Sequence, residues 1–165
     1  MQKNEDKMNN QFQIALSLCD VGDDFYKQGN LVKAKSCFEE SLKLYKDFSA
    51  INSDLSKLLN KLGSVCRALG ELQMARAHLE ESLRTYQLIL EKQQEKVSLI
   101  DIAATLNNLA NVFFSLGDLH KAKTNYESAL TLYDELGKED GDGDGGGGGG
   151  GEAMNSLDIA ILLYN

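Results

Sequence analysis

Three glycines mark an internal repeat, and this repetition constrains the fold more than any other feature of the sequence. When the chain is aligned on Gly29, Gly70 and Gly117, seven positions carry the same residue in all three copies, within a window of 28 residues. The other six positions hold leucine, leucine, alanine, glutamate, leucine and tyrosine: Leu18, Leu59 and Leu106; Leu31, Leu72 and Leu119; Ala34, Ala75 and Ala122; Glu39, Glu80 and Glu127; Leu42, Leu83 and Leu130; Tyr45, Tyr86 and Tyr133. Self-similarity of this kind predicts a repeat architecture.

The spacing of apolar residues predicts what one unit looks like. Before the glycine of the second copy, Leu59, Leu62 and Cys66 lie three or four residues apart, as one face of a helix requires. After it, Ala75 and Leu79 begin a second apolar face with the same spacing. Glycine is suited to the left-handed end of the first helix, and a polar residue after it can cap the next one. Each unit is therefore predicted to be an antiparallel pair of helices joined by a short turn.

Small residues recur where the two helices of a unit must approach closely. Gly22, Gly63 and Ala110 stand seven residues before the three turn glycines. A missing or small side chain lets a neighbouring helix pack against the backbone. Gly137 follows the last predicted helix, where we expect it to act as a C-terminal cap.

The repeated segments resemble the tetratricopeptide repeat (TPR). The resemblance is carried by LCDVGDDFYKQGNLVKAKSCFEESL, LNKLGSVCRALGELQMARAHLEESL and LNNLANVFFSLGDLHKAKTNYESAL, which with flanking helix cover most of residues 15–136. It implies an all-α fold, a right-handed α-solenoid of antiparallel helix pairs. No proline ends the second helices, and the turn glycines are 41 and 47 residues apart, against about 34 in the standard unit. These long units are similar to those of kinesin light chains, with EKQQEKV (91–97) as an expected helical extension.

The chain divides into four predicted regions. A polar N-terminal tail covers residues 1–11, and three helix pairs follow over 12–138, at about 12–48, 53–97 and 98–138. An Asp/Gly-rich flexible loop then covers 139–151. Residues 152–165 are expected to start a fourth repeat or to form a capping helix, because Asp158 and Ile159 match the unit openings at Asp54-Leu55 and Asp101-Ile102. Whether the chain is a fragment of a longer array stays open.

The Asp/Gly-rich stretch has a second interpretation as a calcium loop. Asp140, Asp142, Asp144 and Gly145 match the first half of the pattern D-x-D-x-D-G. The bidentate glutamate of such a loop is missing, because Gly151 stands at its position. We therefore interpret the stretch as a linker between repeats and expect no metal.

Charge and composition exclude several classes of partner. The formal net charge is −8 and the pI is about 4.8, so the chain repels a phosphate backbone and we expect no nucleic-acid partner. No apolar run reaches the ~18 residues that a membrane span needs, and the first residues lack the apolar run of a signal peptide. Without such a run we expect no membrane partner. The three cysteines are odd in number and show no CxxC spacing, which favours a reduced, cytoplasmic protein.

Residues that could support chemistry are few. His78 and His120 are the only histidines, and neither belongs to a sequence pattern of metal ligands. Cys19, Cys37 and Cys66 lie on or near apolar helical faces, as small core residues do. No phosphate loop, dinucleotide loop or nucleophile elbow is present. We therefore predict that the chain is not an enzyme and has no cofactor.

The remaining candidate site is a surface. In the resembled family the first helices line the concave face of the solenoid, which places residues ten, nine, six and three before each turn glycine on that face. Several of these are asparagines, which are poor helix formers but can both donate to and accept from a peptide backbone. The same rule also places Cys19 and Asp20 on that face. The predicted peptide-binding residues are Asp23, Tyr26, Asn60, Lys61, Ser64, Arg67, Asn107, Asn108, Asn111 and Phe114.

Two functions are compatible with this surface. The first is a non-catalytic protein–protein interaction scaffold that binds a peptide segment of a partner in the concave groove. The second is a structural subunit that assembles through the ends of its solenoid without a groove ligand. In that case self-association would use the exposed apolar residues of the terminal helix, from Ile159 to Leu163.

Overall fold

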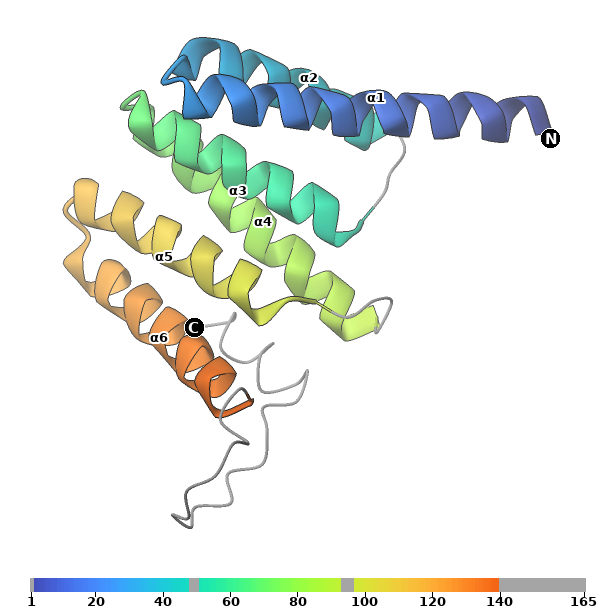
Figure 1. Ribbon diagram of the computed structural model, residues 1–165. Coiled ribbons are helices and arrows are strands. Elements are labelled where there is room, and N and C mark those ends of the chain that lie inside the picture. The colour runs from blue at the N-terminus through green and yellow to red at the C-terminus, as the bar shows by residue number, and fades with distance from the viewer. Residues whose placement is uncertain (1, 48–50, 93–96, 140–165) are drawn as a thin grey trace.

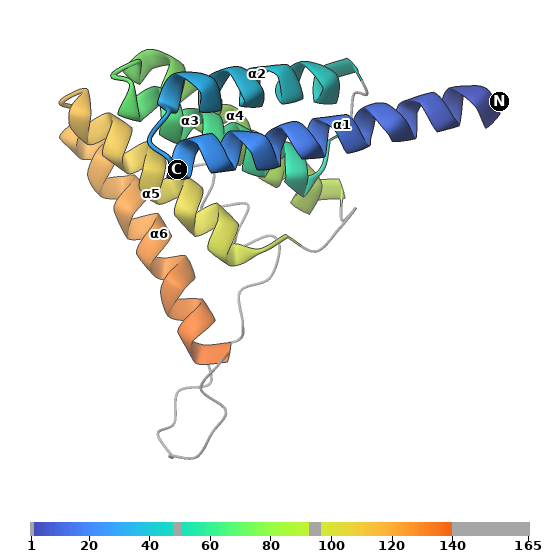
Figure 2. The same ribbon diagram turned by 45° about the horizontal axis from the view of Figure 1, so that its top comes forward.

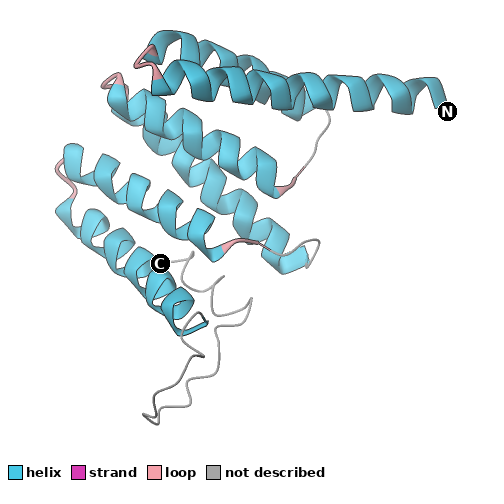
Figure 3. Cartoon of the chain, viewed as in Figure 1, coloured by secondary structure: helices cyan, strands magenta, loops and turns pink. Residues whose placement is uncertain are grey.

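The computed structural model describes residues 2–47, 51–92 and 97–139, and all regular structure in these ranges is α-helical (Figure 3). The described residues form six helices: α1 (Gln2–Lys27), α2 (Leu31–Asp47), α3 (Ser53–Ala68), α4 (Leu72–Lys92), α5 (Leu99–Ser115) and α6 (Leu119–Glu139). The predicted all-α class is confirmed.

Glycine turns join the two helices of each pair. Gly29, Gly70 and Gly117 have φ values of 75°, 79° and 81°, in the left-handed region that ends a helix at low cost only for glycine. Asn30 and Asp118 then cap the second helices, since each side-chain Oδ1 accepts from the backbone amide three residues later, at 3.3 and 3.1 Å. The predicted turns are therefore present in all three units, and the predicted side-chain caps are present in the first and third.

The three pairs stack in chain order. In Figure 1, α1 and α2 lie side by side, α3 and α4 follow, and α5 and α6 form the last pair. The turned view in Figure 2 shows the same succession, with each pair rotated relative to the one before it. Between pairs, α2 contacts α3 and α4 contacts α5, while α3 also contacts α5 directly. The stack thus has a first-helix layer (α1, α3, α5) and a second-helix layer (α2, α4, α6).

The helices of a pair meet at the predicted small residues. A Cβ atom added at Gly22 would lie 2.5 Å from Cε1 of Phe38, and one at Gly63 would lie 2.4 Å from Cγ of Leu79. Both of these large partners are fully buried. In the third pair alanine replaces glycine at position 110, and the residue that takes the place of the large partner, Tyr126, is only half-buried. Close approach of the helices therefore explains the small residues at this position.

Buried hydroxyl groups also form hydrogen bonds between the two helices in each of the first two pairs. Ser41 Oγ donates to the carbonyl of Ala15, and Ser82 Oγ donates to the carbonyl of Ser56, both at 2.7 Å. These contacts join α1 to α2 and α3 to α4 at the same position of the repeat. In the third pair the equivalent of the donor is Ala129, so this bond is absent there. Sequence reasoning did not find this contact, because the acceptors are backbone carbonyls.

Several helix ends differ from the expected boundaries. α1 begins at Gln2, within the expected N-terminal tail. Gly137 lies inside α6, which continues to Glu139, so the prediction of a C-terminal cap at Gly137 is wrong. The residues after it, Lys and Glu, are good helix formers and no proline stops the helix. α4 ends at Lys92, and residues 93–96 of the expected extension lie outside the described residues, as do the Asp/Gly-rich stretch from 140 onward and the predicted fourth unit.

Candidate functional site

A hollow lies between the first two helices of the first-helix layer. Its volume is about 160 Å³, and five of the ten predicted peptide-binding residues line it. The lining residues are Asp23, Tyr26, Phe38, Asn60, Lys61, Ser64 and Val65. We refer to the surface of α1, α3 and α5 that carries the predicted residues as the first-helix face.

An ion pair forms one wall of the hollow. Lys61 Nζ donates to Asp23 Oδ2 at 2.5 Å, which links α3 to α1. The Lys61 ammonium also lies 5.9 Å from the ring centroid of Phe38, within the range of a cation–π contact. The positive charge of Lys61 is thus matched inside the chain.

Polar contacts between neighbouring units follow a common register. Asn108 Nδ2 donates to Asn60 Oδ1 at 2.9 Å and lies 3.2 Å from Ser64 Oγ, which links α5 to α3. Ser64 and Asn108 stand six and nine residues before their own turn glycines, and Asp23 and Lys61 occupy the same two positions one unit earlier. In both cases the residue six positions before one turn glycine contacts the residue nine positions before the next turn glycine. This six-to-nine contact joins each first helix to the following first helix.

The residue three positions before the turn glycine has a different character in each unit. Three positions before the turn glycine stand Tyr26, Arg67 and Phe114. The Phe114 side chain is 62% exposed and Tyr26 is 43% exposed. Arg67 is half-buried, and its Nε is buried without a hydrogen-bond partner in the described part of the chain. A buried donor without an acceptor is costly to the folded state.

At the third unit, two asparagines occupy the first-helix face in different ways. Asn107 is exposed, and its carbonyl accepts from Asn111 Nδ2 at 2.9 Å. Asn111 Oδ1 accepts from the phenol of Tyr126 at 2.8 Å, which ties α6 to the first-helix face. Tyr126 was not among the predicted residues, because the prediction took residues from the first helices only and Tyr126 lies on the second helix of its pair.

One residue that the repeat rule places on the first-helix face does not lie there. Cys19 is buried, and its Sγ lies 3.1 Å from Ser41 Oγ of α2. The expectation that Cys19 points to the concave face is therefore wrong. Its small apolar side chain packs in the core instead, as the interpretation of the cysteines as core residues expected.

Comparison with known families decides what kind of repeat this is. Two family models, both described as Tetratricopeptide repeat, match residues 13–88 and 102–136, together about two thirds of the chain. The chain belongs to the tetratricopeptide repeat family. Repeats of this family form protein–protein interaction modules and are typically non-catalytic. No curated protein matches the chain.

Two buried thiols and one half-buried imidazole of these TPR units are poorly placed for chemistry. Burial raises the pKa of the Cys66 thiol to about 11 and also raises that of Cys19, so neither is an activated nucleophile at neutral pH. Burial lowers the pKa of His78, which keeps this imidazole neutral. Among the described residues no three His, Cys, Asp or Glu side chains are grouped as metal ligands. No described helix has the length and apolar character for crossing a bilayer.

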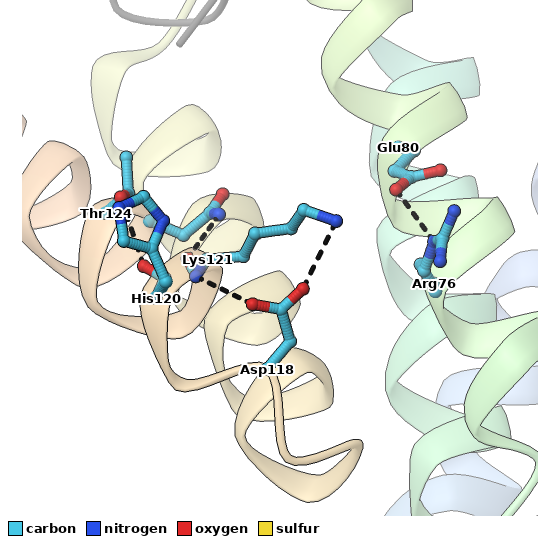
Figure 4. A network of polar contacts seen from close by, with 7 residues as sticks. Arg76, Glu80, Asp118, His120, Lys121 and Thr124 are labelled. Carbon is cyan, nitrogen blue, oxygen red and sulfur yellow. Dashed lines mark hydrogen bonds and ion pairs between the residues drawn. The ribbon is translucent and has the colours of Figure 1, made fainter.

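A second cleft lies between α4 and α6 in the second-helix layer. Its volume is about 460 Å³, with Leu106, Leu109 and Phe113 of α5 among its lining residues. Figure 4 shows the polar residues near it. The described ion pairs here stay within one element or its cap: Arg76 Nε donates to Glu80 at 2.9 Å, and Lys121 Nζ lies 3.2 Å from Asp118. By contrast, ion pairs from Lys35 to Glu71 and from Lys46 to Glu81 cross between α2 and the second unit. The predicted peptide-binding residues do not include any of the cleft residues.

Proposed function

We propose that this chain is a non-catalytic interaction scaffold that binds a peptide segment of a partner protein along the first-helix face. The TPR family supports the general class, because its repeats are protein–protein interaction modules. The observation that carries the specific proposal is the row formed by Tyr26, Arg67 and Phe114. This row combines two exposed aromatic side chains with a half-buried guanidinium whose Nε has no acceptor among the described residues.

The chemistry of this row indicates what the ligand must supply. Apolar side chains of a peptide would pack against Tyr26 and Phe114, since aromatic residues are frequent anchors at interfaces. A backbone carbonyl or a carboxylate would accept from the half-buried Arg67 guanidinium. Asn107 adds an exposed amide that can donate to and accept from a peptide backbone. A peptide segment supplies all of these groups at once.

The inter-unit contacts limit which asparagines can bind the ligand. Asn108 Nδ2 already donates to Asn60 Oδ1, so this donor and this acceptor are used inside the chain. The remaining amide groups are Asn108 Oδ1 and Asn60 Nδ2, for which the described residues offer no hydrogen bond. In our proposal these two asparagines hold neighbouring units in register and present only their second amide group to the peptide.

We also infer that the units belong to the long-period type similar to kinesin light chain repeats. The turn glycines are 41 and 47 residues apart. The family model over residues 102–136 is of the kinesin-light-chain type, which supports this assignment. We place the chain in the cytoplasm as part of the same proposal, because Cys19, Cys37 and Cys66 are all free thiols, which a reducing compartment maintains.

The test uses peptides selected against the full chain from a displayed random library. Their Kd is measured by fluorescence anisotropy for the wild type and for a Tyr26→Ala, Phe114→Ala variant. We expect the double variant to weaken binding by about tenfold or more, equivalent to ~1.4 kcal/mol, because it removes both aromatic anchors.

The control variant for this test carries Val32→Ala and Met74→Ala. These side chains are also apolar and exposed, but they lie on α2 and α4 in the second-helix layer. Their removal should leave the Kd unchanged. Equal affinity of the wild type and the aromatic double variant, or an equal loss in the control, would contradict binding on the first-helix face.

Assembly through the ends of the stack is the alternative function. Its support is the outer face of α6, where Leu119, Leu130 and Tyr133 are exposed. Under this alternative the mass measured by sedimentation rises with protein concentration, and the selected peptides do not depend on Tyr26 or Phe114.

A further inference from the structure

The outer face of α6 differs from the same face of the two earlier second helices. Leu130 is 59% exposed and Tyr133 is 43% exposed. Both belong to the repeated positions of the unit, thirteen and sixteen residues after the turn glycine. The equivalent residues in the first two units are buried, at 8% exposure or less: Leu42 and Tyr45 in α2, and Leu83 and Tyr86 in α4.

The first helix of the following unit covers these positions in the first two units. Leu42 and Tyr45 share a core cluster with Leu58 and Leu59 of α3. Leu83 and Tyr86 share the next cluster with residues of α5, among them Ile102 and Leu106. Nothing in the described residues covers α6 in the same way. Leu130 and Tyr133 are therefore exposed at two positions that the next first helix covers in each earlier unit.

The end of the chain carries the residues that this contact requires. Asp158 and Ile159 align with Asp54-Leu55 and Asp101-Ile102, which begin the earlier units. In this register, four apolar residues of the C-terminal segment align with buried residues of α5. Ile159, Ala160, Leu162 and Leu163 are equivalent to Ile102, Ala103, Thr105 and Leu106, all of which are buried.

We propose that residues 152–165 form the first helix of a fourth unit and cover Leu130 and Tyr133 on α6. This inference goes beyond peptide binding, because it concerns the end of the stack and not the first-helix face. It also assigns a role to the Asp/Gly-rich stretch as the linker that returns the chain to α6. The twelve residues 140–151 can span up to ~40 Å when extended, more than the ~30 Å length of a 21-residue helix such as α6.

A segment of the same chain is a better occupant than a second copy. Because the segment is covalently linked to α6, its effective concentration is in the millimolar range, well above the concentration of free copies in a dilute solution. Closure entropy grows only slowly with linker length, so the long glycine tract adds little cost. Each copy therefore covers its own α6, and the face is not left for assembly.

A single tryptophan can report whether Tyr133 is covered. The chain has no tryptophan, so the Tyr133→Trp variant of the full chain contains a single tryptophan, which is excited selectively at a wavelength where the remaining tyrosines do not absorb. We expect its emission at a shorter wavelength than that of a Leu119→Trp variant. Leu119 is 62% exposed and is the first residue of α6, fourteen residues and ~21 Å along the helix from Tyr133.

Substitutions in the C-terminal segment then test the occupant. Adding Ile159→Ser and Leu163→Ser to Tyr133→Trp should shift the emission to the longer wavelength of an exposed indole. The matched control is Leu157→Ser, because residue 157 is equivalent to Ile100, which is 56% exposed on α5. This control should leave the emission unchanged. Far-ultraviolet circular dichroism checks that the three described units remain folded in each variant.

Three outcomes would overturn the proposal. One is an exposed emission of the Tyr133→Trp variant in the otherwise unchanged chain. A second is an emission that does not respond to Ile159→Ser with Leu163→Ser. The third is a shorter-wavelength emission that disappears on dilution while sedimentation shows a dimer becoming a monomer, which would assign the face to a second copy.

Discussion

At the scale of single residues, the close approach of the two helices in a unit depends on positions that have no side chain. Gly63 lies in α3 directly against Leu79 of α4, and Gly22 has the same relation to Phe38 one unit earlier. Interiors are close-packed, so an added methyl group has no space unless a helix moves. The third unit accommodates Ala110 because Tyr126 there is half-buried and turns its phenol to Asn111.

The Gly63→Ala substitution tests this account of close approach. The added Cβ would lie 2.4 Å from Leu79 Cγ, so α3 and α4 must separate. We expect a loss of ~1–3 kcal/mol in the free energy of unfolding, measured by urea denaturation. The control is Gly137→Ala, which lies inside α6 with no atom within 4 Å of the added Cβ. That variant should be as stable as the wild type or slightly more stable, and a larger loss there than at Gly63 would contradict the account.

The sequence was sufficient to predict these small residues but not every partner on the first-helix face. Gly22 and Gly63 were predictable because they recur at one position of a repeat whose helices must touch. The contact from Tyr126 to Asn111 was not, since it depends on how far α6 rotates against α5 once alanine replaces glycine. Likewise, the burial of Cys19 follows from its contact with Ser41 on the neighbouring helix. Such contacts depend on three-dimensional packing that spacing alone does not specify.

At the scale of helices, the units are joined by contacts that repeat with the sequence. The six-to-nine contact links α1 to α3 through Asp23 and Lys61, and α3 to α5 through Ser64 and Asn108. The chemistry changes from an ion pair to neutral hydrogen bonds, but the geometry of stacking is the same. The asparagines were predicted only as ligand contacts. Their structural role was not predictable, because it requires the offset between neighbouring helices.

A double-mutant cycle on Asn60 and Asn108 tests this structural role. Asn108 Nδ2 donates to Asn60 Oδ1 at 2.9 Å, so the two Asn→Ala substitutions should not be additive. We expect a coupling of ~0.5–1.5 kcal/mol in the free energy of unfolding. Asn60 with Asn125 serves as the control pair, because Asn125 lies on α6 and donates within its own helix. Additivity of the Asn60 and Asn108 substitutions would show that the bond does not hold the units together.

At the scale of the whole molecule, stacking sorts residues with the same repeat position into different environments. Tyr45 and Tyr86 are buried between units, whereas Tyr133 is exposed on the last described helix. The sequence shows all three as the same position, so only their place in the stack distinguishes them. Stacking also aligns Tyr26, Arg67 and Phe114 on successive first helices, which creates the surface proposed to bind a peptide.

The most direct test of the central claim is to map the bound peptide on the full chain by nuclear magnetic resonance. A peptide selected from a displayed library is titrated into the ¹⁵N-labelled protein. The account predicts that the largest changes affect the Arg67 Nε–H and Asn107 side-chain signals and the backbone amide of Phe114. Signals of Val32 on α2 and Met74 on α4 should stay in place. Changes centred on the cleft between α4 and α6, with Arg67 and Phe114 unaffected, would contradict it.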